Sequence, residues 1–443
     1  MAPWDRISAL PDALIHQILS FLNVEDAVPT SILSKRWRYQ WTFIPNLCFG
    51  ENLYDKAHMD TIDKCIKQYQ ANQLEKLCIK TMVWDAELSQ IHQWLDFAVE
   101  RGVSDLTIRG NWFTVPDALF SVQTLQSLTF SNCYLHRPSD IKCFESLRHL
   151  SLYNVNEYDG AIKLILSKCR RIQNLDLNTT SEPEPDNFSV SLPELQTIYI
   201  YLTCKVFTIR APKLQVLEVY GHINKMDIQD TPLLKHVQFS FQQTYKPPSM
   251  DVDDLGSCMN YIANVKTLRL TEQVFQLYTK YCLTGTSTVF RNLKILYLQE
   301  VRQLVFVYPY MRFLRNCPSL EELHINFWKP DAFDKVGVID NDVNQILELG
   351  DNFLDHLKVI NIIYFWASPN KMLLLKCLLE KATALEKVRL HLCDDMGEDK
   401  KEMLLQLPKA SFNARIELYD KLHLYAKDVG GAISLFRTPV LRL

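Results

Sequence analysis

Signatures of catalysis and of cofactor binding are missing from this sequence of 443 residues. It contains no P-loop and no G-x-G-x-x-G, H-E-x-x-H or G-x-S-x-G pattern. With only 12 glycines, few segments could wrap a phosphate group, and the 11 histidines are isolated from one another. Nothing in the sequence therefore argues for an enzyme, a cofactor or a metal site, and we expect a non-catalytic protein.

Charge of one sign and long hydrophobic runs are also missing. The net charge is -3, and basic pairs such as Lys35 with Arg36 are too short to bind nucleic acid or an anionic membrane. The first residues include acidic side chains and lack the apolar segment of a secretory signal. No stretch approaches the roughly 20 apolar residues of a membrane span. We therefore expect a cytoplasmic or nuclear protein, or one found in both, with no nucleic-acid or membrane partner.

Cysteine is present, but not in pairs that a metal or a redox motif would use. The 12 cysteines are scattered singly, without a C-x-x-C motif. Several, including Cys78, Cys133, Cys169 and Cys377, have apolar neighbours in the sequence, where cysteine behaves as a small hydrophobic residue. The interpretation is reduced thiols packed in a core, rather than disulfides or zinc ligands.

A six-residue pattern, apolar-x-x-apolar-x-apolar, recurs thirteen times between residues 74 and 390. Most successive copies are spaced near the roughly 20–29 residues of a leucine-rich repeat. Within each copy, the last two apolar residues share one face of a strand. One strand cannot bury that face alone, so stacking many parallel strands forms a continuous core. The copies begin at Leu74, Val103, Leu125, Leu147, Ile172, Leu195, Leu214, Leu234, Val265, Leu293, Leu320, Leu357 and Leu385.

Helical segments separate several of these copies. Residues 86–101, 160–169 and 306–317 have helical periodicity, and each precedes a copy. The predicted fold class is α/β, a leucine-rich-repeat solenoid with parallel strands on the concave face and helices and loops on the convex face. An ordinary doubly wound α/β domain is the alternative, although the spacing is too short for most full crossover helices. Polar segments expected to be loops are 181–187, 242–254 and 329–342.

The residues between the core positions of each strand are predicted to face the concave surface. Tyrosine is a common anchor at protein interfaces, although it also suits strands in general. Our hypothesis is that tyrosines on this face bind a target protein: Tyr199, Tyr201, Tyr220 and Tyr297. Others expected on the same face include Lys76, Asp176, Glu218, Gln238, Arg269, His324, Asn361 and Arg389.

The first fifty residues lack the repeat and are predicted to form short helices. Pro11 can open a helix, because a missing N–H costs nothing at its first position. A second helix is expected from Asp26, as N-cap, to about Ser34, with Pro29 in its first turn. A third is expected over residues 35–41. So small a module has more apolar residues than it can bury, which predicts contact with the repeats or with a partner.

Residues 5–41, DRISALPDALIHQILSFLNVEDAVPTSILSKRWRYQW, closely resemble the F-box of plant F-box/LRR proteins of the FBD group. The specific parts are LPD (10–12), ILSFL (18–22) and AV-x-TS-x-LSKRWR (27–38). Residues 357–390 are similar to the FBD segment of that group. The resemblance divides the chain into an F-box (1–50), irregular leucine-rich repeats (51–350), FBD-like terminal repeats (351–425) and a C-terminal tail (426–443).

The resemblance implies a non-catalytic substrate-recognition subunit of an SCF-type (Skp–cullin–F-box) ubiquitin ligase. The F-box would bind a Skp-type adaptor, and through it a cullin, and the repeats would bind an unknown target protein. Pro29 departs from the group, which carries a polar or basic residue there, and this predicts weaker adaptor binding. The adaptor-binding residues implied are Leu10, Pro11, Ile15, Ile18, Leu19, Leu22, Val28, Leu33, Ser34 and Trp37.

Two other functions stay open at this point. One is a leucine-rich-repeat scaffold with a degenerate F-box and no role in a ubiquitin ligase. The other is a co-receptor that depends on a small molecule held by the repeats.

Overall fold

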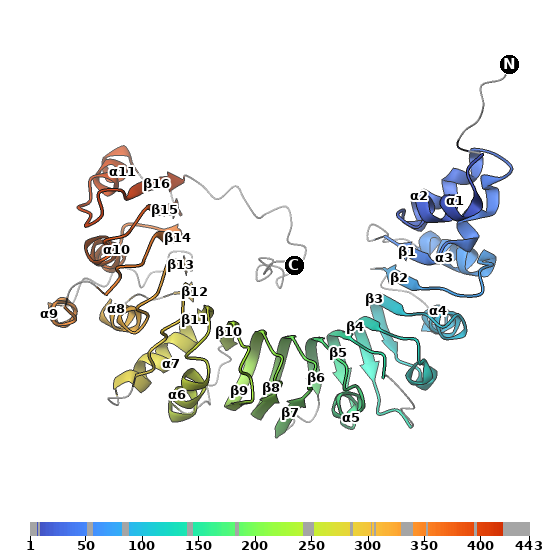
Figure 1. Ribbon diagram of the computed structural model, residues 1–443, viewed down its shortest axis with the longest axis horizontal. Helices are drawn as coiled ribbons and strands as arrows, with labels where there is room; N and C mark the ends of the chain where they lie inside the picture. Colours follow the sequence, from blue (N-terminus) through green and yellow to red (C-terminus); the bar gives the residue numbers. More distant parts are fainter. Residues whose placement is uncertain are drawn as a thin grey trace, which may run out of the picture. The chain divides into compact units, whose positions relative to one another are not determined.

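The structure is a computed structural model, shown in Figure 1, and it divides into two compact units, Met1–Leu234 and Lys235–Leu443. The residues that it describes are Ile7, 9–50, 56–81, 88–139, 145–181, 186–241, 252–283, 287–302, Leu304, 307–328, 340–350, 353–393 and 397–419.

The first unit begins with a helical module and continues into a parallel sheet. Its helices are α1 (Asp12–Leu19), α2 (Val24–Ala27), η1 (Val28–Ile32), η2 (Trp37–Phe43), α3 (Lys56–Gln68), α4 (Leu88–Glu100), η3 (Asp117–Ser121) and α5 (Ala161–Lys168), where η marks 3₁₀ geometry. Its strands are β1 (Asn46–Phe49), β2 (Lys76–Lys80), β3 (Asp105–Thr114), β4 (Ser127–Leu135), β5 (His149–Glu157), β6 (Asn174–Ser181), β7 (Asn187–Ser191), β8 (Thr197–Arg210) and β9 (Val216–Gln229). The strand order is β1-β2-β3-β4-β5-β6-β8-β9, and β7 pairs with β8.

The second unit has a parallel sheet in which strands follow one another in chain order. These strands are β10 (His236–Phe241), β11 (Thr267–Thr271), β12 (Ile295–Val301), β13 (Glu322–Phe327), β14 (Val359–Phe365), β15 (Lys387–Leu392) and β16 (Arg415–Tyr419). Its helices are α6 (Val252–Tyr261), α7 (Glu272–Leu283), α8 (Tyr308–Arg315), α9 (Asp340–Glu348), α10 (Pro369–Lys381) and α11 (Glu398–Leu405).

The thirteen copies of the apolar pattern predict the strands closely. In every case the strand begins two residues after the first apolar residue of the copy, as at Leu74 for β2 and Leu385 for β15. That first residue is buried just before the strand, and the two later apolar residues point into the core. In each unit, helices lie along one side of the parallel strands (Figure 1). The predicted α/β leucine-rich-repeat fold class is confirmed.

A residue with left-handed backbone geometry recurs at the sixth position of several strands. Asn132, Asn154, Glu300 and Tyr364 all have φ between 53° and 56°, and each is followed by a buried apolar side chain. Gly221, with φ of 107°, occupies the same place in β9. Asn154 donates a hydrogen bond from Nδ2 to Oδ1 of Asn132 (2.6 Å), so asparagine, which tolerates this conformation, also links neighbouring repeats.

The N-terminal module differs from prediction in its second helix. Helix α2 begins at Val24 rather than being capped by Asp26, and it changes into η1 at Val28. Pro29 lies in the first turn of η1, and it has no N–H to donate to the carbonyl group of Glu25. An α-helical hydrogen-bond pattern cannot continue through that position, which explains the change of helix type.

The predicted loops lie mostly outside the described residues. Helices α6 and α9 begin within the last residues of 242–254 and 329–342, so those two loops end earlier than expected. The remaining residues of these loops, most of 181–187 and the whole tail 426–443 are outside the part of the chain that the structure describes.

Candidate functional site

Helix α1 carries two apolar stripes that are one residue apart in the sequence. Ile15 and Leu19 belong to the buried stripe, and both are fully buried. The helix packs against η2, where Trp37 and Trp41 are also buried. The core of the module is therefore made by one face of α1 and the two tryptophans.

Polar contacts hold α1 and η2 together at the surface. Arg36 donates a hydrogen bond from Nη2 to Oδ1 of Asp12 at 2.7 Å. That hydrogen bond holds the pKa of the Asp12 carboxyl below its usual value. Nε2 of His16 lies 2.7 Å from Oε1 of Gln40, one turn along η2. Because Asp12 and Arg36 are exposed, their ion pair orients the two helices more than it stabilises them.

The second stripe of α1 faces solvent. Leu14 and Ile18 are 45% and 46% exposed, and Phe21, one turn further, is 81% exposed. Ile32 of η1 is 87% exposed. Among the described residues, eight of the seventeen exposed large apolar side chains fall between residues 7 and 43: Ile7, Leu14, Ile18, Phe21, Ile32, Leu33, Tyr39 and Phe43. Such a concentration on so small a module is typical of an interaction surface.

The predicted adaptor-binding residues divide by burial. Pro11, Ile18 and Leu33 are exposed, while Leu10, Leu22, Val28 and Ser34 are half-buried. Ile15, Leu19 and Trp37 are buried in the core of the module, which favours a structural role for them, and their contact with an adaptor stays a prediction. Sequence reasoning missed Leu14, Phe21 and Ile32, although the spacing of residues 14, 18 and 21 marks one helical face.

The helical module is joined to the first repeat by hydrogen bonds to main-chain groups. Glu25 accepts a hydrogen bond at Oε1 from the N–H of Gly50, just after β1 (2.8 Å). The N–H of Gln70 donates to the carbonyl oxygen of Thr42 (3.0 Å), and the N–H of Glu75 donates to that of Pro45 (2.8 Å). The exposed apolar surface is thus fixed to the start of the sheet.

Three of the four predicted target-binding tyrosines lie together on β8 and β9. Tyr201 is opposite Tyr220 in the strand register, and the rings of Tyr199 and Tyr220 have centroids 4.7 Å apart. Tyr220 is buried and donates a hydrogen bond to Oε2 of Glu218 (3.0 Å). Tyr199 and Tyr201 are half-buried, so they are the members of this group that a target could contact. Tyr297 lies on β12, in the second unit.

A ladder of stacked side chains crosses β11, β12 and β13. Arg269, Tyr297 and His324 are register partners on these strands. The guanidinium group of Arg269 lies 4.2 Å from the centroid of the Tyr297 ring, which stacks on His324. His324 also contacts Oε2 of Glu322 (3.1 Å), yet burial dominates and lowers the pKa of His324. Arg269 is buried beneath this stack and Tyr297 is half-buried, so the Tyr297 ring is the member of the ladder that a target could contact.

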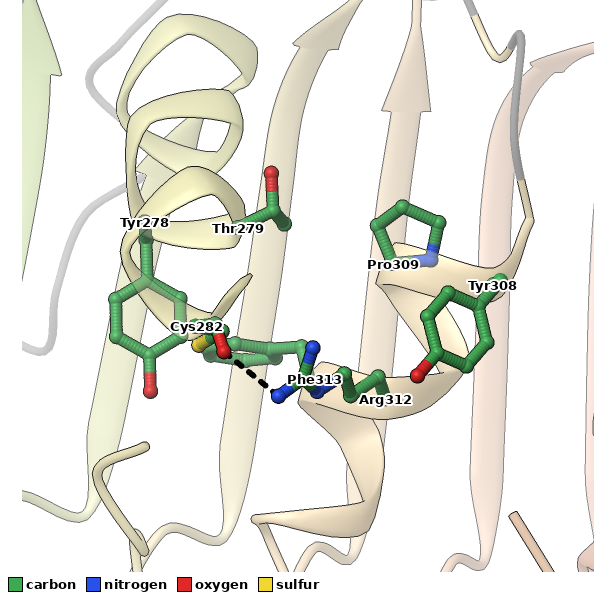
Figure 2. A pocket seen from close by; sticks show the side chains of 7 residues that line it. All are labelled: Tyr278, Thr279, Cys282, Tyr308, Pro309, Arg312 and Phe313. Carbon is green, nitrogen blue, oxygen red and sulfur yellow. Dashed lines mark hydrogen bonds between the residues drawn. The ribbon is translucent and has the colours of Figure 1, made fainter. Parts of the chain in front are cut away.

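A pocket of about 60 Å³ lies between α7 and α8, as Figure 2 shows. Arg312 crosses it and donates a hydrogen bond from Nη2 to the carbonyl oxygen of Cys282 (2.7 Å). Burial raises the pKa of the Cys282 thiol, which makes that thiol a poor nucleophile. The volume suits one or two water molecules and is far below that of a drug-sized ligand site.

Other kinds of site were sought in the described ranges. No three histidine, cysteine or acidic side chains gather there in a way that could hold a metal ion. None of the described helices combines the length and the apolarity that crossing a bilayer requires.

Family models match both parts of the chain. The model described as the At1g61320/AtMIF1 LRR domain matches residues 66–412, which is most of the chain. The F-box domain model matches residues 7–48, the segment that carries the exposed apolar surface. The chain belongs to the F-box/LRR-repeat family.

Relatives of this F-box/LRR-repeat protein are found in Arabidopsis thaliana. It is 33% identical over 231 residues to the F-box/LRR-repeat protein At3g26922, covering 49% of this chain and 75% of that one. It is 30% identical over 232 residues to the F-box/FBD/LRR-repeat protein At5g56420, covering 48% of this chain and 55% of that one. It is 24% identical over 455 residues to the putative F-box/LRR-repeat protein At3g42770, covering 93% and 80%. These names agree with the resemblance to the plant FBD group.

Proposed function

We propose that this protein is the substrate-recognition subunit of an SCF-type ubiquitin ligase. In this role the F-box binds a Skp-type adaptor, and through it a cullin, while the repeats bind a target protein. The observation that carries the proposal is the group of exposed apolar side chains on the F-box module. The module has folded its core around Ile15, Leu19 and the two tryptophans, and a full second apolar stripe is left in solvent.

The energetics favour a partner on this surface. Burying one large apolar side chain that is exposed contributes roughly 1.5–3 kcal/mol. Phe21 and Ile32 are the most exposed of the group, so a partner that covers them would bury more of their apolar surface than that of the other side chains. A few well-covered side chains usually supply most of the affinity of a protein interface.

The protein is proposed to be non-catalytic, because an F-box joined to leucine-rich repeats is the composition of a receptor family. We propose the cytoplasm, the nucleus or both as its location, since those are the compartments where such a ligase would act. Tyr199 and Tyr201 on one unit, and Tyr297 on the other, are the side chains proposed to contact the target.

The test is binding of the full chain to a recombinant Skp-type adaptor, measured by isothermal titration calorimetry. Phe21→Asp puts a charge in the proposed interface and is expected to weaken binding at least about tenfold, or 1.4 kcal/mol. Leu233→Asp is the matched control, because Leu233 is 49% exposed but lies far along the chain, after β9. It is expected to bind as the natural chain does.

Two outcomes would count against the proposal. If the natural chain shows no binding, the F-box is degenerate and the scaffold function replaces the ligase. If Phe21→Asp and Leu233→Asp bind equally well, the exposed stripe is not the adaptor surface. The small-molecule co-receptor gains no support from the α7–α8 pocket, because that pocket is too small.

A further inference from the structure

Cys48 and Cys78 face each other across two neighbouring strands. They are register partners in the parallel pair formed by β1 and β2. Leu47, Phe49 and Ile79 point into the core, so both cysteines lie on the opposite face of the sheet. Both are free thiols, and they are the only two cysteines that meet in register among the strand pairs that the structure describes.

Their separation is compatible with a covalent bond. Neighbouring strands lie about 4.7–4.9 Å apart, and the Cα atoms of disulfide-linked cysteines are usually about 4.4–6.8 Å apart. The Cβ atoms of a disulfide are about 3.8 Å apart, so the Cβ atoms of two directly opposed residues on neighbouring strands must move roughly one ångström closer for the bond to form. Strand β1 stands at the end of the strand order and has only four residues, so it is the strand that can make this shift.

The charges around the pair make one thiol the nucleophile. Lys76 and Lys80 flank Cys78 on the same strand and the same face, and Lys76 pairs with Asp105 at 2.8 Å. The hydrogen bond from the Cys48 thiol, followed by the charges of Lys80 and Lys76, lowers the pKa of Cys78. The pKa of Cys48 is raised, chiefly by the same hydrogen bond. Cys78, which lies between the two lysines, is therefore the thiol of the pair that ionises more readily, although burial opposes its ionisation.

We propose that Cys48 and Cys78 form a redox-active dithiol that a peroxide oxidises to a reversible disulfide. The Cys78 thiolate attacks one oxygen of hydrogen peroxide, the O–O bond breaks, and the sulfur becomes a sulfenic acid. The hydroxide that leaves takes up the proton that the Cys78 thiol released on ionising, and becomes water. The Cys48 sulfur then attacks the sulfenic sulfur, forming the S–S bond and releasing a second water. The two thiols lose two electrons, and the peroxide gains them. Such an oxidation needs a thiol of low pKa with a resolving cysteine beside it, and Cys78 and Cys48 fill these two roles.

The chemistry separates this pair from the other cysteines. Cys133 and Cys169 are fully buried, and burial raises the pKa of each thiol to about 12. Such thiols are almost wholly protonated at neutral pH and react slowly with peroxide. Cys393 is half-buried like Cys48 and lies on the other unit, so it serves as an internal comparison.

The bond would have a defined structural effect. Strand β1 follows the F-box module directly, after Ile44, and β2 opens the repeats. A Cys48–Cys78 disulfide would therefore tie the end of the F-box to the first repeat covalently. The proposal does not depend on the identity of the adaptor or of the target.

The test is disulfide mapping of the full natural chain after treatment with hydrogen peroxide. Remaining thiols are blocked with iodoacetamide, and the chain is cut with trypsin without reduction. Cleavage after Lys76 and Lys80 isolates LCIK, which is expected to appear linked to the fragment of residues 39–56 that contains Cys48. Dithiothreitol should release both fragments, and Cys393 should remain blocked by iodoacetamide.

Two variants test the order of attack. In Cys48→Ser, Cys78 should accumulate as a sulfenic acid that dimedone traps, because the resolving thiol is gone. In Cys78→Ser, Cys48 should react no faster than Cys393. The proposal is overturned if the natural chain shows no linked fragment while Cys78 is oxidised beyond the sulfenic acid, or if Cys78 is oxidised no faster than Cys393.

Discussion

Tyr297 and His324 stack on neighbouring strands, with ring centroids 4.4 Å apart and ring planes within 13° of each other. The other face of the Tyr297 ring holds the guanidinium group of Arg269. A protonated His324 would be a second buried cation beside the same ring. The positive charges of Arg269 and Arg389 also oppose this protonation, although burial is the larger cause of the lowered pKa of His324.

Stability is therefore expected to fall with acidification. The unfolded chain takes up a proton at His324 near pH 6.5, while the folded chain resists it to a lower pH. The unfolded state binds more protons in that window, so the free energy of unfolding decreases as pH falls through 6.5. His236 and His391 also have lowered pKa values, again chiefly from burial, and act in the same direction.

His324→Phe should reduce this pH dependence, because phenylalanine keeps a ring on Tyr297 and cannot titrate. The measurement is the thermal unfolding midpoint at pH 7.5 and pH 5.5. Tyr297→Phe is the control and should leave the difference between the two midpoints unchanged. An unchanged difference in His324→Phe would show that the stacked histidine is not a source of the acid sensitivity.

The two stripes of α1 should respond differently to truncation. Ile15→Ala removes a fully buried side chain and is expected to cost about 2–5 kcal/mol of unfolding free energy. Phe21→Ala removes an exposed side chain and should change the unfolding free energy by less than about 0.5 kcal/mol. Chemical denaturation of both variants checks this. A large loss in Phe21→Ala would mean that Phe21 belongs to the core.

Gly221 and Gly160 make a matched pair, because both have positive φ angles. Gly160→Ala meets no atom within 4 Å of the new methyl group, so its cost is that of the left-handed backbone alone, about 1–2 kcal/mol. Gly221→Ala would place its methyl group against the carbonyl oxygen of Leu202 on β8. It should cost clearly more than Gly160→Ala in thermal unfolding, and equal costs would contradict this close approach of β8 and β9.

Pro29→Ala tests whether the proline is strained. Pro29 is exposed and lies in the first turn of η1, where its ring is accommodated. The substitution should lower stability slightly, by about 0.4–1 kcal/mol, because alanine makes the unfolded chain more flexible. A gain of more than about 1 kcal/mol in denaturant unfolding would instead show that proline interrupts a helix that the module prefers.

The sequence predicts strands well here because one pattern determines both secondary structure and burial. The same pattern marks β1, where Ile44, Leu47 and Phe49 are all buried, although we did not predict that strand. Strand β16 is harder to find, because Asn413 stands where the first apolar residue should be. Strand β7 is an extra strand paired beside β8 and has no full copy of the pattern.

The interaction surface is only partly predictable. Residues 14, 18 and 21 and residues 15, 19 and 22 form two stripes of similar apolar character on one short helix and the turn that follows it. Periodicity alone cannot decide which stripe meets the tryptophans of η2, since that depends on contacts distant in the sequence. The pairing of Cys48 with Cys78 was missed for a different reason: it follows from aligning the copy of the pattern in β1 with the copy in β2, and we did not predict β1.

The exposed stripe of the F-box module also bears on how much of this protein a cell would keep. Phe21 and Ile32 are 81% and 87% exposed, beside a module whose core is buried. Chaperones and proteases survey apolar surface of this kind, and a newly made chain without a partner shows it continuously. Cellular abundance is then expected to follow the supply of whatever protein covers those two side chains, rather than the rate of synthesis alone.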